Sequence, residues 1–174
     1  MNSDYKAVDY KAIDYKTIEY QVDNKILTLL LNRPEVMNAY TIEMCNELVH
    51  AFNRASDDAD VSVVVVTGAG RAFCAGMDLK QVLESTTVSP GEQDVLDRLC
   101  DNVLGPLRYF PKPVIASLNG VTLAGGLELA MCADLVLAAQ SAKIGDAHAN
   151  FGVYPGAGGA AVLPRIVPLN VAKY

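Results

Sequence analysis

The stretch that decides the fold is Val61-Ser62-Val63-Val64-Val65-Val66-Thr67, followed at once by Gly68-Ala69-Gly70. β-Branched side chains favour extended backbone, and an unbroken apolar run is typical of a strand that is covered on both faces. Such strands occur in parallel sheets, where helices pack on both sides. The glycines follow at the carboxyl end of the strand, which is the edge where open α/β sheets bind ligands.

On both sides of this strand, short apolar runs alternate with helical patterns. Cys45, Leu48, Val49 and Phe52 have helical spacing, and Thr41 is in position to cap that helix. Strand, helix, strand, helix, strand is the order expected of an α/β fold. The further elements that the pattern predicts are strands over 26–31, 114–118 and 135–138, and helices near 78–83, through 95–107 and over 125–133.

The N-terminus carries a repeat with a period of five residues, which matches neither a helix nor a strand. Its copies are Asp4-Tyr5-Lys6, Asp9-Tyr10-Lys11 and Asp14-Tyr15-Lys16. We therefore predict a flexible extension over residues 1–14 and one core domain over residues 15–174. Apolar residues alternate with polar ones from Ile18 to Val22, which predicts an additional strand at the start of that domain.

Composition excludes several classes of function. The chain has 174 residues and a formal net charge of −6, which disfavours nucleic acid and anionic membrane surfaces as general partners. Four cysteines without a CxxC pair and two histidines give no framework for a metal site. We read the cysteines as free thiols of a cytoplasmic protein, since neither a signal peptide nor a membrane-spanning run is evident. His50 lies on a polar helix position and is predicted to be solvated.

Two glycine-bearing turns carry the candidate chemistry. In Leu123-Ala124-Gly125-Gly126-Leu127-Glu128, a glycine pair opens a helix whose first N–H groups lack internal partners and suit a developing oxyanion. A carboxylate, Glu128, follows in the first turn. A tight turn with a favourable acidic residue would look the same. The turn from Gly68 to Leu79 is neither a Walker A loop nor a dinucleotide fingerprint, because Phe73 occupies the place of the third glycine.

Taken together with other segments, these turns resemble the crotonase (enoyl-CoA hydratase/isomerase) superfamily from about Tyr15 to Tyr174. The ordered motifs that carry the resemblance are Asn32-Arg33-Pro34 before Asn38-Ala39, Gly70-Arg71-Ala72-Phe73-Cys74-Ala75-Gly76-Met77-Asp78-Leu79, Pro113-Val114-Ile115-Ala116, Gly120 with Ala124-Gly125-Gly126-Leu127-Glu128-Leu129-Ala130, Cys132-Ala133-Asp134, Pro155-Gly156-Ala157-Gly158-Gly159 and Leu163-Pro164-Arg165.

The resemblance implies a spiral of ββα units and an acyl-CoA thioester substrate, with no cofactor beyond the CoA that the substrate carries. It implies that the peptide N–H groups of Met77 and Gly125 form an oxyanion hole for the thioester oxygen. It also implies CoA contacts from the residues around that turn and from the turn near residue 33, although a charged surface turn would explain the latter equally well. The implied substrate-binding residues are Ala75, Gly76, Asp78, Leu79, Arg33 and Val36.

In hydratases of this family two glutamates move the protons. The first aligns with Glu128, whereas the second aligns with His148. A histidine accepts or donates a proton near neutral pH and can replace the missing acid. Alternatively, His148 hydrogen-bonds to Asp146 or Glu128 and orients the site, or it only fills space. A site with one carboxylate also suits isomerisation or another enolate reaction, such as hydrolysis of a carbon–carbon bond.

The function expected from these residues is reversible hydration of a 2-enoyl-CoA, with enoyl-CoA isomerisation as the alternative. A non-catalytic acyl-CoA-binding or assembly protein is the alternative from another class. Val171 to Tyr174 has the character of a helix opening without a stop signal, so we expect that a C-terminal helical part is missing. The resemblance implies a homotrimer or hexamer for the longer chain. The sequence indicates neither the acyl chain length nor the pathway.

Overall fold

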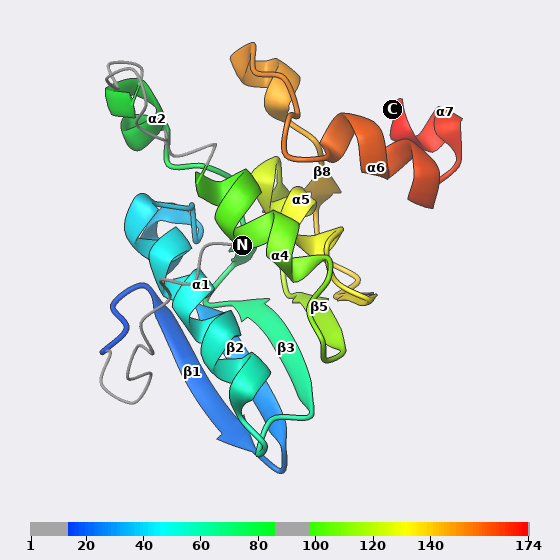
Figure 1. Ribbon diagram of the computed structural model, residues 1–174. Helices are drawn as coiled ribbons and strands as arrows, with labels where there is room; N and C mark the ends of the chain where they lie inside the picture. Colours follow the sequence, from blue (N-terminus) through cyan, green and yellow to red (C-terminus); the bar gives the residue numbers. More distant parts are fainter. Residues whose placement is uncertain (1–13, 86–97, 174) are drawn as a thin grey trace, which may run out of the picture.

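The computed structural model describes residues 14–85 and 98–173. The first two copies of the N-terminal repeat and the predicted helical positions Val95 and Leu96 lie outside the described residues. The described part is a mixed α/β structure of two small sheets with helices packed around them (Figure 1). The predicted α/β class is therefore confirmed.

The larger sheet has five strands in the order β1-β2-β3-β5-β7. β1 pairs antiparallel with β2, and every other neighbouring pair is parallel, as the β-branched run predicted. The third strand starts two residues later than predicted, because Ser62 bonds to the Lys25 carbonyl before the ladder begins. The strands of this sheet are β1 (Ile18–Asp23), β2 (Ile26–Leu31), β3 (Val63–Gly68), β5 (Val114–Leu118) and β7 (Leu135–Ala138).

A second sheet of three short parallel strands lies beside the first, in the order β4-β6-β8. These strands are β4 (Ala72–Cys74), β6 (Val121–Leu123) and β8 (Ile144–Gly145). Each follows closely after a strand of the larger sheet and precedes a helix, so that β3-β4, β5-β6 and β7-β8 repeat one unit. This repetition is the predicted spiral of ββα units.

The first helix, α1 (Ile42–Asp57), lies along one face of β1, β2 and β3 (Figure 1). The Thr41 hydroxyl accepts a hydrogen bond from the Met44 N–H at 3.1 Å, so the predicted cap is confirmed. Leu48 and Phe52 are buried on its inner face, together with Leu27, Leu29 and other strand residues of the core.

The remaining helices are short. The helix predicted over 125–133 ends at residue 130. The helix predicted through 95–107 is described from residue 98 and continues to residue 107, with π-helical hydrogen bonding up to Leu104. Within the described ranges no helix combines the length and the apolar character needed to cross a membrane. These helices are η1 (Pro34–Val36), α2 (Leu79–Ser85), η2 (Arg98–Leu104), α4 (Gly105–Leu107), α5 (Gly125–Ala130), η3 (His148–Phe151), α6 (Gly159–Ile166) and α7 (Leu169–Ala172).

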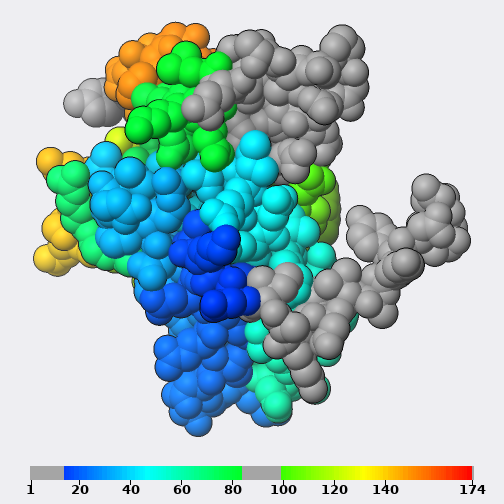
Figure 2. Space-filling model, turned by 90° about the vertical axis from the view of Figure 1, so that its left-hand side faces the viewer, coloured from blue at the N-terminus to red at the C-terminus, as the bar shows by residue number. Residues whose placement is uncertain are grey.

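The start of the described chain is bound to α1. The buried Glu47 carboxylate accepts hydrogen bonds from the Lys16 and Thr17 N–H groups, and Figure 2 shows these first residues, in dark blue, against the surface of α1. His50 is not simply solvated, contrary to our prediction. Its Nδ1 lies 2.8 Å from the Tyr15 hydroxyl, and partial burial lowers the pKa of His50.

All four cysteines are free thiols, as predicted. Burial raises the pKa of Cys74 to about 12, so this thiol is not a nucleophile near neutral pH. Among residues 14–85 and 98–173, no group of three or more potential metal ligands gathers.

Candidate active site

The two glycine-bearing turns meet at the end of β4 and the start of α5. Gly76 has φ +100°, and a Cβ there would lie 3.0 Å from the Ala124 Cβ and 3.3 Å from the Gly125 nitrogen. Glycine is therefore required at position 76 by both the backbone angle and the contact. Gly126 is packed even more closely, since a Cβ there would lie 2.2 Å from the Cys74 carbonyl oxygen. The two segments that sequence analysis singled out thus touch backbone to backbone.

The Met77 N–H points away from its neighbouring strand segment. Tyr40 forms an isolated parallel bridge with Met77, in which the Tyr40 N–H donates to the Gly76 carbonyl and the Tyr40 carbonyl accepts from the Asp78 N–H, both at 2.8 Å. In a parallel bridge the central residue directs its own N–H to the opposite side. Within the described parts of the chain, the Met77 N–H has no hydrogen-bond acceptor.

The Gly125 N–H opens α5. It belongs to the first helical residue, so it has no acceptor within the helix. Ala124, which precedes it, has φ 50° and ψ −122°, a combination that residues with a Cβ rarely adopt. The Ala124 N–H donates to the Gly145 carbonyl at 3.3 Å, which fixes this turn against β8. Strained backbone at a turn that contacts the other glycine segment is a feature of functional sites.

Glu128 lies in the first turns of the same helix and is 2% exposed. Its Oε1 accepts a hydrogen bond from the Gly159 N–H at 2.8 Å, and its Oε2 lies 3.7 Å from the His148 Nε2. Burial raises the pKa of Glu128, whereas the Gly159 N–H and the nearby imidazole oppose that rise. The carboxylate is thus bound by a backbone amide and faces one titratable ring, an arrangement that can transfer protons.

His148 is the first residue of η3, and both of its ring nitrogens face carboxylates. Its Nδ1 makes a hydrogen bond with the Asp146 Oδ1, and its Nε2 faces Glu128. Its side chain is 12% exposed, whereas that of Asp146 is 42% exposed. Of the two hydrogen bonds that sequence analysis left open, the structure therefore has the one to Asp146, and it places Glu128 at ion-pair distance from the ring.

Arg108 binds the loop that precedes Gly159, the residue whose N–H donates to Glu128. Its guanidinium donates to the Ala157 carbonyl at 3.0 Å and to the Cys132 sulfur at 3.3 Å. Gly158 has φ +121° and passes so close to this guanidinium that a Cβ there would lie 2.2 Å from it. Arg108 carries no motif signal of its own, because its role depends on three segments that only the fold brings together.

Some of the residues predicted to bind CoA pack against the segment from 37 to 40, whereas Val36 and Leu79 are exposed. Ala75, Gly76, Met77 and Asp78 lie together, beside the segment from 37 to 40 to which the Ala75 and Asp78 N–H groups donate. The Arg33 guanidinium forms an ion pair with the Asp78 carboxylate at 3.2 Å, and both side chains are largely buried. Arg33 is therefore not the free surface cation that the turn allowed.

Val36 and Leu79 are the exposed members of the predicted CoA set, at 37% and 49%. Asp78 also accepts from the Lys80 N–H at 3.1 Å, so it caps α2 as well as pairing with Arg33. Asn38 was not predicted to have a role of its own. It is fully buried, and its amide group donates to the Ala69 and Ala72 carbonyls. It thereby joins this segment to the first glycine turn.

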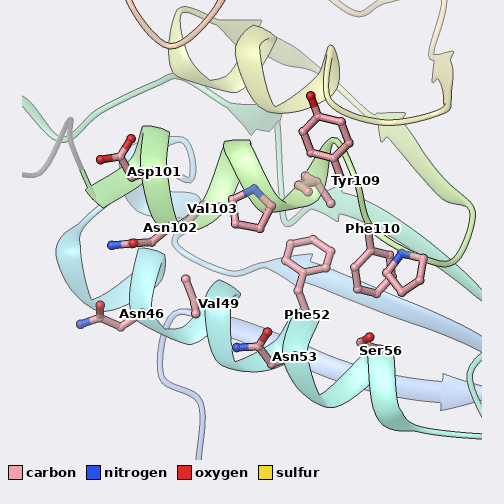
Figure 3. Close-up of a pocket in the computed structure, with 13 residues that line it drawn as sticks. Asn46, Val49, Phe52, Asn53, Ser56, Asp101, Asn102, Val103, Tyr109 and Phe110 are labelled. Atoms are coloured by element: carbon pink, nitrogen blue, oxygen red, sulfur yellow. The ribbon is translucent and has the colours of Figure 1, made fainter. Parts of the chain in front are cut away.

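A separate hollow of about 520 Å³ lies between α1 and the segment from η2 to Pro111 (Figure 3). Phe52 and Phe110 meet there edge to face, with ring centroids 5.4 Å apart. The predicted site residues do not line this hollow, and its lining pairs no carboxylate with a histidine. The candidate site is therefore the contact region of the two glycine turns, where a carboxylate and a histidine face each other.

Comparison with known proteins gives an independent view of this arrangement. Residues 21–174 match the family model described as "Enoyl-CoA hydratase/isomerase". The chain is 37% identical over 146 residues to the 1,2-epoxyphenylacetyl-CoA isomerase of Escherichia coli K12, covering 83% of this chain and 56% of that protein. It is 36% identical over 152 residues to the crotonyl-CoA hydratase of Syntrophomonas wolfei, covering 87% and 57% respectively. The chain thus spans about half the length of the curated relatives it matches.

Solved structures agree with the fold. A putative enoyl-CoA hydratase from Streptomyces coelicolor A3(2) superposes with a TM-score of 0.84 at 29% identity, covering 99% of this chain and 63% of that one. An enoyl-CoA hydratase subunit from Geobacillus kaustophilus gives a TM-score of 0.79 at 34% identity, covering 91% and 60%.

Proposed function

The chain belongs to the enoyl-CoA hydratase/isomerase family, and on that premise we propose that it binds an acyl-CoA thioester and reversibly hydrates a 2-enoyl-CoA. The observation that carries this proposal is the position of the buried Glu128 carboxylate, three residues after Gly125 and opposite His148 at 3.7 Å. The reaction needs no separate cofactor, because CoA is part of the substrate.

In this proposal the thioester oxygen accepts hydrogen bonds from the Met77 and Gly125 N–H groups. Addition of water to the conjugated double bond moves negative charge onto that oxygen, and two fixed dipoles stabilise it in the transition state. Removing one such donor costs about 3 kcal/mol of transition-state stabilisation in comparable sites. The lack of an acceptor for either N–H group in the described parts of the chain supports this role.

The proton transfers balance within the pair. Glu128 accepts a proton from the water as its oxygen bonds to C3, and protonated His148 donates a proton to C2. The water O–H bond, the His148 N–H bond and the C2=C3 π bond break, and a C–O bond, a C–H bond and an O–H bond on Glu128 form. Glu128 then carries the extra proton and His148 lacks one, so a transfer between them restores the starting state. The raised pKa of Glu128 suits a group that holds a proton during part of the cycle.

Isomerisation of a 3-enoyl-CoA is the second candidate, because Glu128 faces a histidine where the hydratases have a second glutamate. One group would remove a proton from C2 and return it to C4, without water. A panel of 2-enoyl and 3-enoyl esters of short and long chains, tested with the intact protein and with His148→Ala, separates the two reactions. Hydration that survives His148→Ala unchanged would remove His148 from the proposed mechanism.

The primary test is hydration of crotonyl-CoA, followed by loss of the conjugated-thioester absorbance. We expect Glu128→Gln to lower kcat by about 10²- to 10⁴-fold, the usual contribution of a general acid or base, while binding of a CoA ester is kept. Glu47→Gln is the matched control, because Glu47 is also buried and bound by N–H groups but belongs to α1, where it binds the residues that precede β1. Tight CoA binding without turnover by the intact protein would instead indicate a binding or assembly module.

We also propose that the longer protein assembles as a homotrimer or hexamer, which light scattering of the complete polypeptide would test. The four free thiols support a reducing compartment such as the cytoplasm.

A further inference from the structure

Asp146 lies on the side of His148 that faces away from Glu128. We propose that Asp146 is a positioning residue, which fixes the tautomer and the orientation of the His148 imidazole so that Nε2 faces Glu128 and the acyl group. The kinetic consequences of this inference rest on the proposed function, whereas its consequences for the imidazole itself do not.

The hydrogen bond between Asp146 and His148 determines the tautomer. An ionised carboxylate only accepts hydrogen bonds, so the Nδ1 that meets the Asp146 Oδ1 must carry a hydrogen. In the neutral ring, Nε2 is then the nitrogen with the free lone pair. This nitrogen is the one that lies 3.7 Å from the Glu128 Oε2. Without Asp146, the ring could adopt the other tautomer or turn away.

The backbone between the two residues is arranged for this contact. Ala147 has φ 61° and ψ −8°, in the left-handed region that alanine rarely occupies, and the bond between its two neighbours is made across it. The same segment is fixed relative to Glu128, because the Gly145 carbonyl accepts from the Ala124 N–H at the start of α5. Strain at the residue between Asp146 and His148 is explained if the contact serves the site.

The two carboxylates near the ring differ in their exposure. Within residues 14–85 and 98–173, the charged groups at ion-pair distance from His148 are Asp146, from the turn before η3, and Glu128, from α5. Asp146 is 42% exposed and reaches solvent, whereas the Glu128 side chain is 3% exposed. Asp146 can therefore be changed with little risk to the core.

The experiment compares Asp146→Asn and Asp146→Glu with the unchanged chain. The chain contains two histidines, so the ring protons of His148 can be assigned in NMR spectra by comparison with His148→Ala. We expect the ring nitrogen chemical shifts of His148 to show the Nδ1–H tautomer in the unchanged chain and in Asp146→Glu, and a mixture of tautomers in Asp146→Asn. We expect kcat for crotonyl-CoA hydration to fall about 10- to 100-fold in Asp146→Asn, the loss seen when groups that orient metal-bound histidines are changed, with KM unchanged.

A double-mutant cycle decides whether Asp146 acts through His148. In the His148→Ala background, Asp146→Asn should cause no further loss of kcat. An equal loss in both backgrounds would overturn the inference, and so would an unchanged tautomer in Asp146→Asn. If the unchanged chain binds CoA esters but shows no turnover, the proposed function fails, and the NMR measurement of the tautomer alone then decides for or against the Asp146 contact.

Discussion

β2 and β7 belong to one sheet and have similar apolar sequences, yet their surroundings are opposite. Leu27, Leu29 and Leu31 of β2 are fully buried, whereas Leu135 and Leu137 of β7 are 60% and 61% exposed. β2 lies inside the sheet with α1 across it, and β7 forms the last strand (Figure 1). Hydrophobic side chains therefore contribute to stability according to their position in the sheet.

The candidate site lies at the junction of these two regions. Glu128 and the glycine turns are packed against the core cluster. His148 and Asp146 follow the exposed β7 and the short β8. One half of the site thus rests on close-packed backbone, and the other half rests on a few hydrogen bonds. Substitutions in the two parts should therefore differ in their effects on stability.

The largest difference is expected between Leu29→Ala and Leu137→Ala. Truncating a fully buried leucine removes contacts and leaves a cavity, which costs about 2–5 kcal/mol in the free energy of unfolding. Leu137 is 61% exposed, so the same change there should stay within about 0.5 kcal/mol. Denaturant unfolding of both variants measures the two costs. Equal losses would show that β7 is covered in solution, and the comparison between the strands would fail.

A smaller effect is expected from an added methyl group at the two glycine positions. Gly126→Ala places a Cβ 2.2 Å from the Cys74 carbonyl oxygen, whereas Gly145→Ala places one 3.6 Å from a Leu123 methyl group, an ordinary contact. Overpacking costs about 1–3 kcal/mol, and more where backbone must move. We expect Gly126→Ala to lower both stability and turnover while Gly145→Ala changes neither. A stable, active Gly126→Ala protein would disprove the close contact of the two turns.

The smallest effect is expected from the pH dependence of stability. The folded chain holds the Glu128 proton more tightly than the unfolded chain, because burial raises the pKa of Glu128. Folding therefore becomes less favourable as pH rises above the ordinary value of 4.5, and the loss is complete above the raised pKa. The N–H of Gly159 and the ring of His148 limit the effect.

Glu128→Gln lacks this titration and can still accept the bond from Gly159. Its stability relative to the unchanged chain should be level below pH 4.5 and should increase as pH rises beyond it, as measured by denaturant unfolding across a pH series. A constant difference at all pH values would mean that Glu128 titrates as it does in the unfolded chain.

Much of the larger sheet could be predicted from the sequence. The bounds predicted for the strands at 26–31, 114–118 and 135–138 agree with β2, β5 and β7, because each apolar run is stopped by turn residues or proline. The alternation from Ile18 to Val22 likewise corresponds to β1. What the runs could not predict is that β7 is exposed, since burial depends on neighbours elsewhere in the chain.

The strands of the second sheet could not be located from the sequence pattern. They have two or three residues, which is too short for a periodic pattern, and their pairing joins Ala72 to Val121 and Thr122 to Ile144, which are far apart in the chain. The helix predicted to Ala133 ends at Ala130, because the chain must turn into β7, where the Asp134 N–H donates to the Val114 carbonyl. These are tertiary effects that override local preference.

The segments of the candidate site could be predicted from the sequence, but several of its side-chain contacts could not. Motif order indicated Met77, Gly125, Glu128 and His148, and the fold brings their segments together, although their roles remain predictions. The ion pair of Arg33 with Asp78 and the bond between Asp146 and His148 depend on backbone geometry that motif order does not encode. Left-handed backbone at an alanine, as at Ala147, has no signal in a single sequence.

The outward direction of the Met77 N–H has a consequence for diversification of this site. Every amino acid except proline supplies the same peptide N–H, so the donor survives whatever side chain stands at position 77. That side chain is partly buried and packs on the core. In the proposed oxyanion hole, the side chain at position 77 can thus change by ordinary point substitution while the N–H donor is kept.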